Sequence, residues 1–125
     1  MSNYLVFLDG IVPLPQVAEF LGAVQERTPD AEFVLLISTR RGDSEQLSWL
    51  EAARLACESL ETLRAAELPI AEAVVGERGG DSIWEELRRS DRSYDCVLCF
   101  TPYRRGMHVQ RLVPHKQELQ RQLAG

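Results

Sequence analysis

The chain has 125 residues, of which 45% are hydrophobic and 26% charged, and its formal net charge is −5. These values fit one folded domain, residues 1–125, and exclude a disordered tail or a coiled coil. No apolar run approaches the roughly 18 residues of a membrane span, and the N-terminus lacks the pattern of a secretory signal. Because three cysteines, an odd number, favour a reducing compartment, we expect a cytoplasmic protein.

Four short apolar runs predict β-strands. In chain order they are Tyr4–Leu8, Phe33–Ile37, Ile70–Val75 and Cys96–Phe100. Three of them are apolar throughout, which is typical of parallel strands that are buried on both faces. The third run includes Glu72, so we expect it to be a more exposed strand at an edge of the sheet.

The segments between these runs have a helical period. The first contains one apolar stripe at the spacing of a buried helix face: Val17, Phe20, Leu21 and Val24. In the longest segment the predicted stripe is Trp49, Ala53, Ala56, Leu60 and Leu63, with Leu50 and Cys57 beside it. Before the fourth run, Ser82 and Glu85 have the spacing of a capping box, which predicts a helix start there.

A last apolar stripe predicts a helix at the end of the chain: Val109, Leu112, Leu119 and Leu123. Pro114 is expected to break this stripe and to open the final helix. A strand followed by a helix is then repeated along the whole chain. This order predicts an α/β fold of the flavodoxin-like, doubly wound type, with an open parallel sheet of about four strands and helices on both faces.

In such a sheet the loops that follow the strands emerge at one edge, and ligands bind where the strand order reverses. These loops hold five arginines: Arg40, Arg41, Arg78, Arg104 and Arg105. Guanidinium groups near helix N-termini suit a phosphate or a carboxylate. We therefore predict a crevice for a small anionic ligand near Asp9, Arg40, Arg104 and Arg105.

The uneven distribution of charge supports this crevice. Residues 1–85 carry six basic and 15 acidic side chains, a charge of −9, whereas residues 86–125 carry eight basic and four acidic, a charge of +4. Two alternatives remain open: an unevenly charged solvated surface, or pairing of the arginines with acidic residues of the same loops, which are Asp9, Asp43, Glu77 and Asp81. A pI near 5.0 counts against a nucleic-acid partner.

Several stretches of the chain resemble the universal stress protein family. Tyr4–Gly10 resembles its opening strand and Asp-Gly, Leu50–Ala66 with Ile70–Gly76 its long second helix and third strand, and Asp81–Leu87 with Ser93–Leu98 its third helix and fourth strand. Together these stretches cover nearly the whole chain. The resemblance implies a flavodoxin-like sheet, frequent homodimers and, in one branch of the family, ATP binding.

Two departures from that family are visible. The ATP-binding branch carries G-x2-G-x9-G-[S/T] after the fourth strand, and the matching positions here hold Phe100, Tyr103, Val113 and Pro114, which deny close approach of a phosphate. Asp9 stands where nucleotide-binding members use an Asp near the nucleoside. The family also ends in a fifth apolar strand that often pairs dimers. We expect this chain to lack it, as a fragment or as a domain that has lost the strand, and to be unable to pair in that way.

Other constellations give no catalytic reading. Cys96 and Cys99 have C-x-x-C spacing inside a predicted strand, where the two thiols would face opposite sides and pack in the core. His108 and His115 have no Cys or carboxylate at metal-ligand spacing. No nucleotide-binding or hydrolase motif is present, and Trp49 and Trp84 are expected in core or interface contacts. We therefore expect no catalysis, no cofactor and no metal.

The sequence thus predicts a non-catalytic, universal-stress-protein-like regulatory or binding module. It is expected to self-associate or to belong to a larger protein. Two alternatives remain: a sensor of nucleotides or other small ligands with a rearranged site, and a structural dimerisation or interaction domain.

Overall fold

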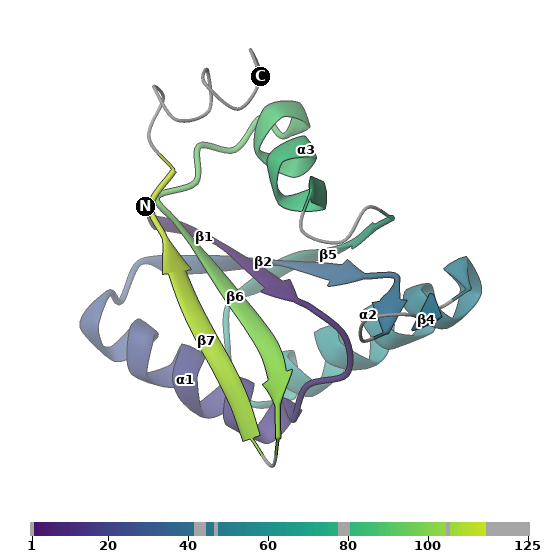
Figure 1. Ribbon diagram of the computed structural model, residues 1–125. Coiled ribbons are helices and arrows are strands. Elements are labelled where there is room, and N and C mark those ends of the chain that lie inside the picture. The colour runs from purple at the N-terminus through teal and green to yellow at the C-terminus, as the bar shows by residue number, and fades with distance from the viewer. Residues whose placement is uncertain (1, 42–44, 47, 78–80, 105, 115–125) are drawn as a thin grey trace.

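The computed structural model describes residues 2–41, 45–46, 48–77, 81–104 and 106–114. At its centre lies a five-stranded sheet in the order β5-β2-β1-β6-β7 (Figure 1). The strands are β1 (Ser2–Leu8), β2 (Ala31–Ser38), β5 (Ile70–Gly76), β6 (Cys96–Tyr103) and β7 (Gly106–Leu112). The first four are parallel to their neighbours, and β7 is antiparallel to β6. The predicted doubly wound α/β fold is confirmed, as is the edge position of β5.

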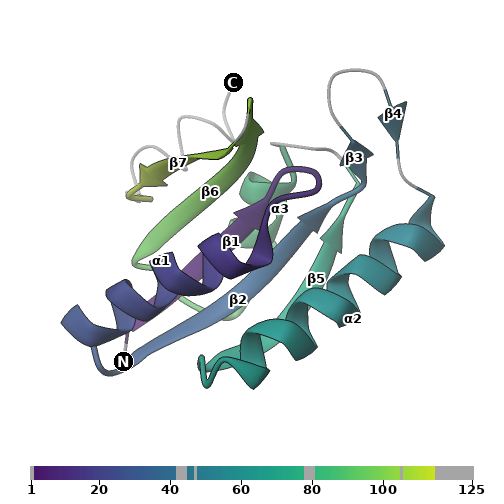
Figure 2. The same cartoon turned by 90° about the horizontal axis from the view of Figure 1, so that it is seen from below.

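The helices divide between the two faces of the sheet. α1 (Leu14–Arg27) and α2 (Trp49–Ala65) cover one face, and α3 (Asp81–Arg89) lies on the other (Figure 2). Because side chains alternate along a strand, β1 contributes Val6 and Leu8 to the α1/α2 face and Leu5 and Phe7 to the α3 face. Within the described residues, no helix is long and apolar enough to cross a membrane.

α1 buries the stripe that its sequence predicts. Val17 and Leu21 are fully buried and Val24 nearly so. Phe20 is half-buried and packs edge-to-face on Phe100 of β6, with the ring centroids 5.4 Å apart. These contacts join the helix to the middle of the sheet.

α2 differs from the prediction because its buried face is rotated by about one residue. The buried residues are Ala52, Ala56, Ser59 and Leu63. Trp49 is 61% exposed and Cys57 is also exposed, so the core prediction for Cys57 is wrong, and Trp49 makes no core contact. Small side chains and a serine form the true buried stripe, and the larger neighbours therefore mark the wrong face. The helix begins after Ser48, whose Oγ accepts a hydrogen bond from the Glu51 N–H at 3.1 Å.

α3 packs closely on the end of β5, and Gly76 makes this possible. A Cβ atom at Gly76 would lie 2.5 Å from Ser82 Cβ and 3.2 Å from Leu36 Cδ1. Because α3 begins at Asp81, Ser82 lies inside the first turn and is buried against the sheet. The prediction that Ser82 opens the helix is therefore wrong by one residue.

β7 corrects the interpretation of the chain's last part. Val109 and Leu112 were expected on a helix, but they lie on a strand that pairs with β6 from Val97↔Leu112 to Tyr103↔Gly106. The expectation of a missing fifth strand is therefore wrong, and with it the argument that edge pairing is unavailable. Leu119 and Leu123 lie outside the described residues.

A second, two-stranded sheet follows β2. It pairs β3 (Arg40–Arg41) with β4 (Glu45–Gln46) in antiparallel register. The segment after Thr39 was expected to be a loop, and it instead begins with this short strand.

Candidate functional site

The carboxyl ends of β1, β2, β5 and β6 share one edge of the sheet because these strands are parallel. The chain moves outward from β1 to β2 and β5 and then returns to the other side of β1 with β6. The strand order therefore reverses between β1 and β6, which is where such folds bind ligands. Asp9 follows β1 at this point, and its N–H donates to the Phe100 carbonyl at 2.9 Å.

Three polar side chains form a row beside this point. Leu8 is in register with Phe100, so the next step aligns Asp9 with Thr101, and Thr101 pairs with His108 of β7. By the alternation of side chains, the row belongs to the α3 face, on which Cys99 also lies. Asp9, Thr101 and His108 thus place a carboxylate, a hydroxyl and an imidazole on three neighbouring strands, about 4.8 Å from one strand to the next.

The predicted arginines lie at different places. Arg104 is exposed at the tip of the β6–β7 hairpin with a φ of 49°, and its guanidinium carbon lies 5.4 Å from the centroid of the Tyr103 ring. It is three residues beyond Thr101, or about 10 Å along the strand direction. Arg40 begins β3, and Arg105 lies outside the described residues. The anion crevice therefore stays a prediction.

A polar cavity of about 370 Å³ lies at the carboxyl end of β5. Its lining comprises Leu36, Val75, Gly76, Glu77, Ser82, Glu85 and Arg89. Thr39 closes its base, since the Thr39 N–H donates to the Gly76 carbonyl at 3.0 Å. Because two carboxylates line it against one guanidinium, this part of the edge does not favour an anion.

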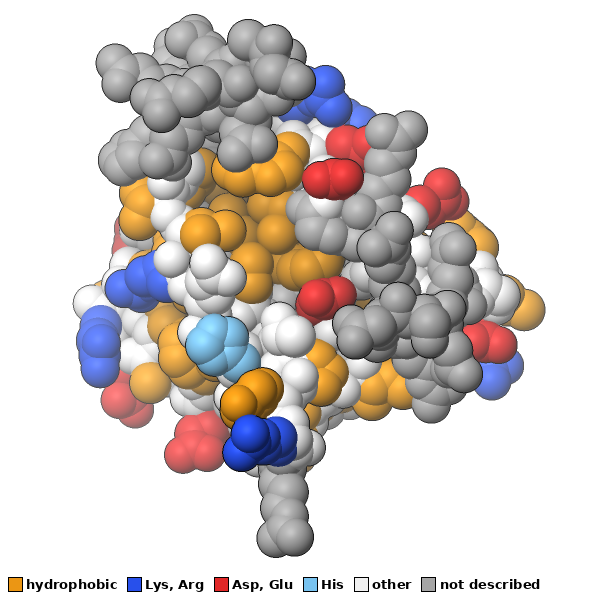
Figure 3. Space-filling view, viewed as in Figure 1, with side chains coloured by type: hydrophobic (Ala, Val, Ile, Leu, Met, Phe, Trp, Pro, Cys, Tyr) orange, Lys and Arg blue, Asp and Glu red, His pale blue; other side chains and the backbone are white. Residues whose placement is uncertain are grey.

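A second cavity lies on the α3 face at the other end of β6. It measures about 310 Å³ and is lined by Ile83, Trp84, Leu87, Val97, Arg111, Leu112, Val113 and Pro114. Figure 3 shows hydrophobic side chains gathered in a hollow on this face. This apolar cavity, named the α3–β7 cavity below, was not foreseen from the sequence.

The two thiols of β6 are poor nucleophiles. Cys96 packs on the α1/α2 face and Cys99 on the α3 face, so the prediction of opposite faces is confirmed. Burial raises the pKa of Cys99 to about 11, and the neighbouring Asp9 carboxylate adds to this effect. Burial also raises the pKa of Cys96, although the Arg111 charge opposes it. Among the described residues, no cluster of His, Cys, Asp and Glu is suited to a metal ion.

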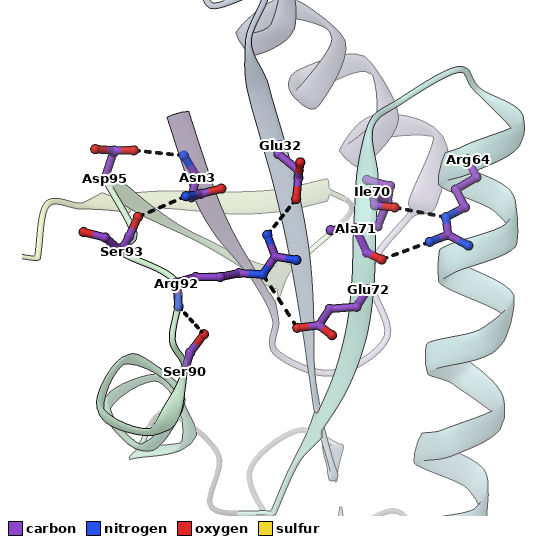
Figure 4. Close-up of polar contacts among 10 residues, drawn as sticks. All are labelled: Asn3, Glu32, Arg64, Ile70, Ala71, Glu72, Ser90, Arg92, Ser93 and Asp95. Atoms are coloured by element: carbon purple, nitrogen blue, oxygen red, sulfur yellow. Dashed lines mark hydrogen bonds and ion pairs between the residues drawn. The ribbon is translucent and has the colours of Figure 1, made fainter. Parts of the chain in front are cut away.

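The amino edge of the sheet has a structural role. Arg92 donates to Glu32 Oε1 at 2.6 Å and lies 3.9 Å from Glu72 Oε1 (Figure 4). Asn3 and Asp95 exchange hydrogen bonds next to this pair, at 2.9 and 2.8 Å. These charged groups tie the segment before β6 to β1, β2 and β5, which uses them in the fold rather than in a site.

The residues that sequence reasoning missed share one cause, because Thr101, His108 and the lining of the α3–β7 cavity all depend on β7. The signal was present: Met107 and Val109 alternate with His108 and Gln110 at the period of a strand. The Gly at position 106, after two arginines, is also typical of a hairpin connection. Leu112 falls three residues after Val109, which fits a helix as well.

Comparison with known proteins adds no family: no protein-family model matches the chain, and no curated protein matches it either.

Proposed function

We propose that this chain is a non-catalytic regulatory or binding module of the universal-stress-protein type, which acts in the cytoplasm and does not bind ATP in that family's usual way. The β6–β7 hairpin carries the proposal, because it occupies the stretch in which the ATP-binding branch has its phosphate loop. Phe100 is fully buried, and β6 continues to Tyr103 in register with β7. A phosphate loop needs free N–H groups and close backbone approach, whereas here these groups belong to a strand.

Titration calorimetry with Mg-ATP and with AMP tests this part of the proposal. We expect no heat of binding at millimolar nucleotide. Saturable binding of ATP would contradict the proposal and support the alternative of a nucleotide sensor with a rearranged site.

For a small anionic ligand we propose the crevice of Asp9, Arg40, Arg104 and Arg105. Arg104 supports it, because its stacking on Tyr103 holds the guanidinium at the hairpin without neutralising its charge. The positive charge of residues 86–125 adds a favourable field.

The matched variants Arg104→Gln and Arg88→Gln test the crevice, since both arginines are exposed. With sulfate or a small carboxylate as the probe, Arg104→Gln should weaken binding about tenfold, and Arg88→Gln should leave it unchanged. Equal affinities for both variants and the parent chain would exclude Arg104 from the site.

A second candidate function, a dimerisation domain, is favoured by the position of β7. This seven-residue strand forms one edge of the sheet, and among the described residues no strand pairs with its outer side. An edge strand presents backbone donors and acceptors to another strand. A second copy of the chain could add its own β7 there and continue the sheet.

Sedimentation equilibrium tests this candidate. We expect a monomer–dimer equilibrium that Gln110→Lys on β7 shifts toward monomer, because a charge on an edge strand opposes pairing. Gln16→Lys on the exposed side of α1 is the control and should have no effect. A monomer at every concentration would eliminate this candidate.

A further inference from the structure

The α3–β7 cavity has the character of a small-molecule site. Seven of its lining residues are apolar: Ile83, Trp84, Leu87, Val97, Leu112, Val113 and Pro114. Val97 is 1% exposed and lies deep, whereas Val113 is 51% exposed and lies at the surface. A volume of about 310 Å³ falls at the lower end of the range for small-molecule pockets.

The topology explains why a cavity forms here. A parallel strand after β6 would require a crossover connection, usually a helix, packed on one face of the sheet. β7 is instead antiparallel and follows β6 through a hairpin. α3 covers the side of β2 on this face, and no other described helix covers β6 and β7.

The charge of the cavity comes from one residue. Arg111 is the single charged side chain among the described residues that line it. Arg111 is exposed, and no described carboxylate is paired with it; the described group that interacts with it is the Cys96 thiol. A guanidinium at the edge of an apolar cavity is suited to a ligand that has a carboxylate at one end.

We propose that the α3–β7 cavity binds an amphipathic carboxylate, such as a medium-chain fatty acid or an aryl-alkanoate, with its apolar part between α3 and β6 and its carboxylate on Arg111. An amphipathic amine is disfavoured by the positive charge of Arg111. A phosphate monoester is less well matched, since one guanidinium leaves part of its double charge uncompensated.

This site is separate from the anion crevice proposed above. Val97 and Arg104 are seven residues apart on the β6 hairpin, which corresponds to about 23 Å of extended strand. An effect of Arg111 substitution and an effect of Arg104 substitution therefore report on different sites, and each proposal can fail without the other.

Trp84 provides a direct readout because it lines the cavity. The chain has two tryptophans, and Trp49 is 61% exposed on α2, so Trp49→Phe leaves Trp84 as the single indole without disturbing the core. Decanoate is titrated below its micelle concentration while Trp84 fluorescence is recorded, and decanol and decylamine are titrated in parallel.

We expect a saturable change with decanoate, and binding at least about tenfold weaker for decanol and decylamine, which lack the charge-assisted contact. Arg111→Gln should weaken decanoate binding about tenfold and leave decanol binding unchanged. Arg104→Gln is the matched control and should bind decanoate as the parent chain does. Arg111 is exposed, and thermal melts of all variants confirm that each is folded.

Three results would overturn the proposal. The first is no saturable change with decanoate, and the second is equal binding of the three probes. The third is decanoate binding that appears only after deletion of residues 115–125, because it would mean that the chain's own C-terminal segment fills the cavity.

Discussion

The two faces of the sheet differ in how completely they are buried. The α1/α2 face gathers 18 buried side chains into one cluster, and the α3 face gathers eight among the described residues. Helices of 14 and 17 residues cover the first, whereas a helix of nine covers the second. Replacing a crossover helix by a hairpin thus converts part of a core face into a surface with a cavity. We infer that the α1/α2 face supplies most of the stability and that the α3 face is available for binding.

The largest expected effect is a difference between truncations on the two faces. Leu35 is fully buried on the α1/α2 face, and Leu35→Ala should lower the free energy of unfolding by about 2–5 kcal/mol. Leu87 is half-buried on α3 beside the cavity, and Leu87→Ala should cost about 1 kcal/mol, since less surface is lost from the core. Urea unfolding measures both. Equal losses would contradict the proposed difference between the faces.

Gly76→Ala should have the next largest effect, because the new Cβ would lie 2.5 Å from Ser82 Cβ. Forcing α3 away from β5 should cost about 1–3 kcal/mol, as for other overpacked sites. Ser82→Gly removes the clashing atoms, so the double variant should lose less than the two single variants add up to. Additive losses in this double-mutant cycle would show that the close approach is not the cause.

The comparison of faces also explains what could be predicted from the sequence. Continuous apolar runs such as Val34–Ile37 identify buried parallel strands, because both faces of the sheet are covered along them. β7 has one partner strand and partly exposed faces, so its pattern is weaker and fits a helix at Val109 and Leu112. The α2 stripe was misplaced because Ser59 is buried, and burial of a polar side chain is set by tertiary packing.

The candidate site was predictable only where it follows from local position. Asp9 could be named because it directly follows a predicted strand. Thr101 and His108 join it through the register between β6 and β7, which is a non-local property. The α3–β7 cavity requires in addition that no helix connects these two strands.

A pH effect of intermediate size is expected from Cys99 on the α3 face. Its pKa is raised from 9.0 to about 11 in the folded chain, so the folded state retains a proton that the unfolded state loses. Stability from this group is complete below pH 9 and is lost as the pH rises toward 11. Urea unfolding across this range should show the loss, and Cys99→Ser should reduce it.

Thiol labelling gives the companion measurement. At pH 8, native protein should react with a thiol reagent at the exposed Cys57 and much more slowly at the buried Cys96 and Cys99. Unfolded protein should label at all three. Rapid labelling of Cys99 in the native state would mean that the α3 face opens far more readily than its burial indicates.

The smallest effect is expected at the amino edge, where Arg92 ties the α3 side to Glu32 and Glu72. The Arg92–Glu32 contact is short, but the two side chains are 34% and 29% exposed. Water and salt screen such a pair, so Arg92→Gln should cost at most about 1 kcal/mol, and less at high salt. Arg88→Gln, an exposed change on α3, is the control and should cost nothing measurable. A loss above about 2 kcal/mol, which is outside the range of exposed pairs, would mean that a polar tie rather than apolar packing holds the α3 side, and the difference between the faces would then lie in the kind of contact rather than in its extent.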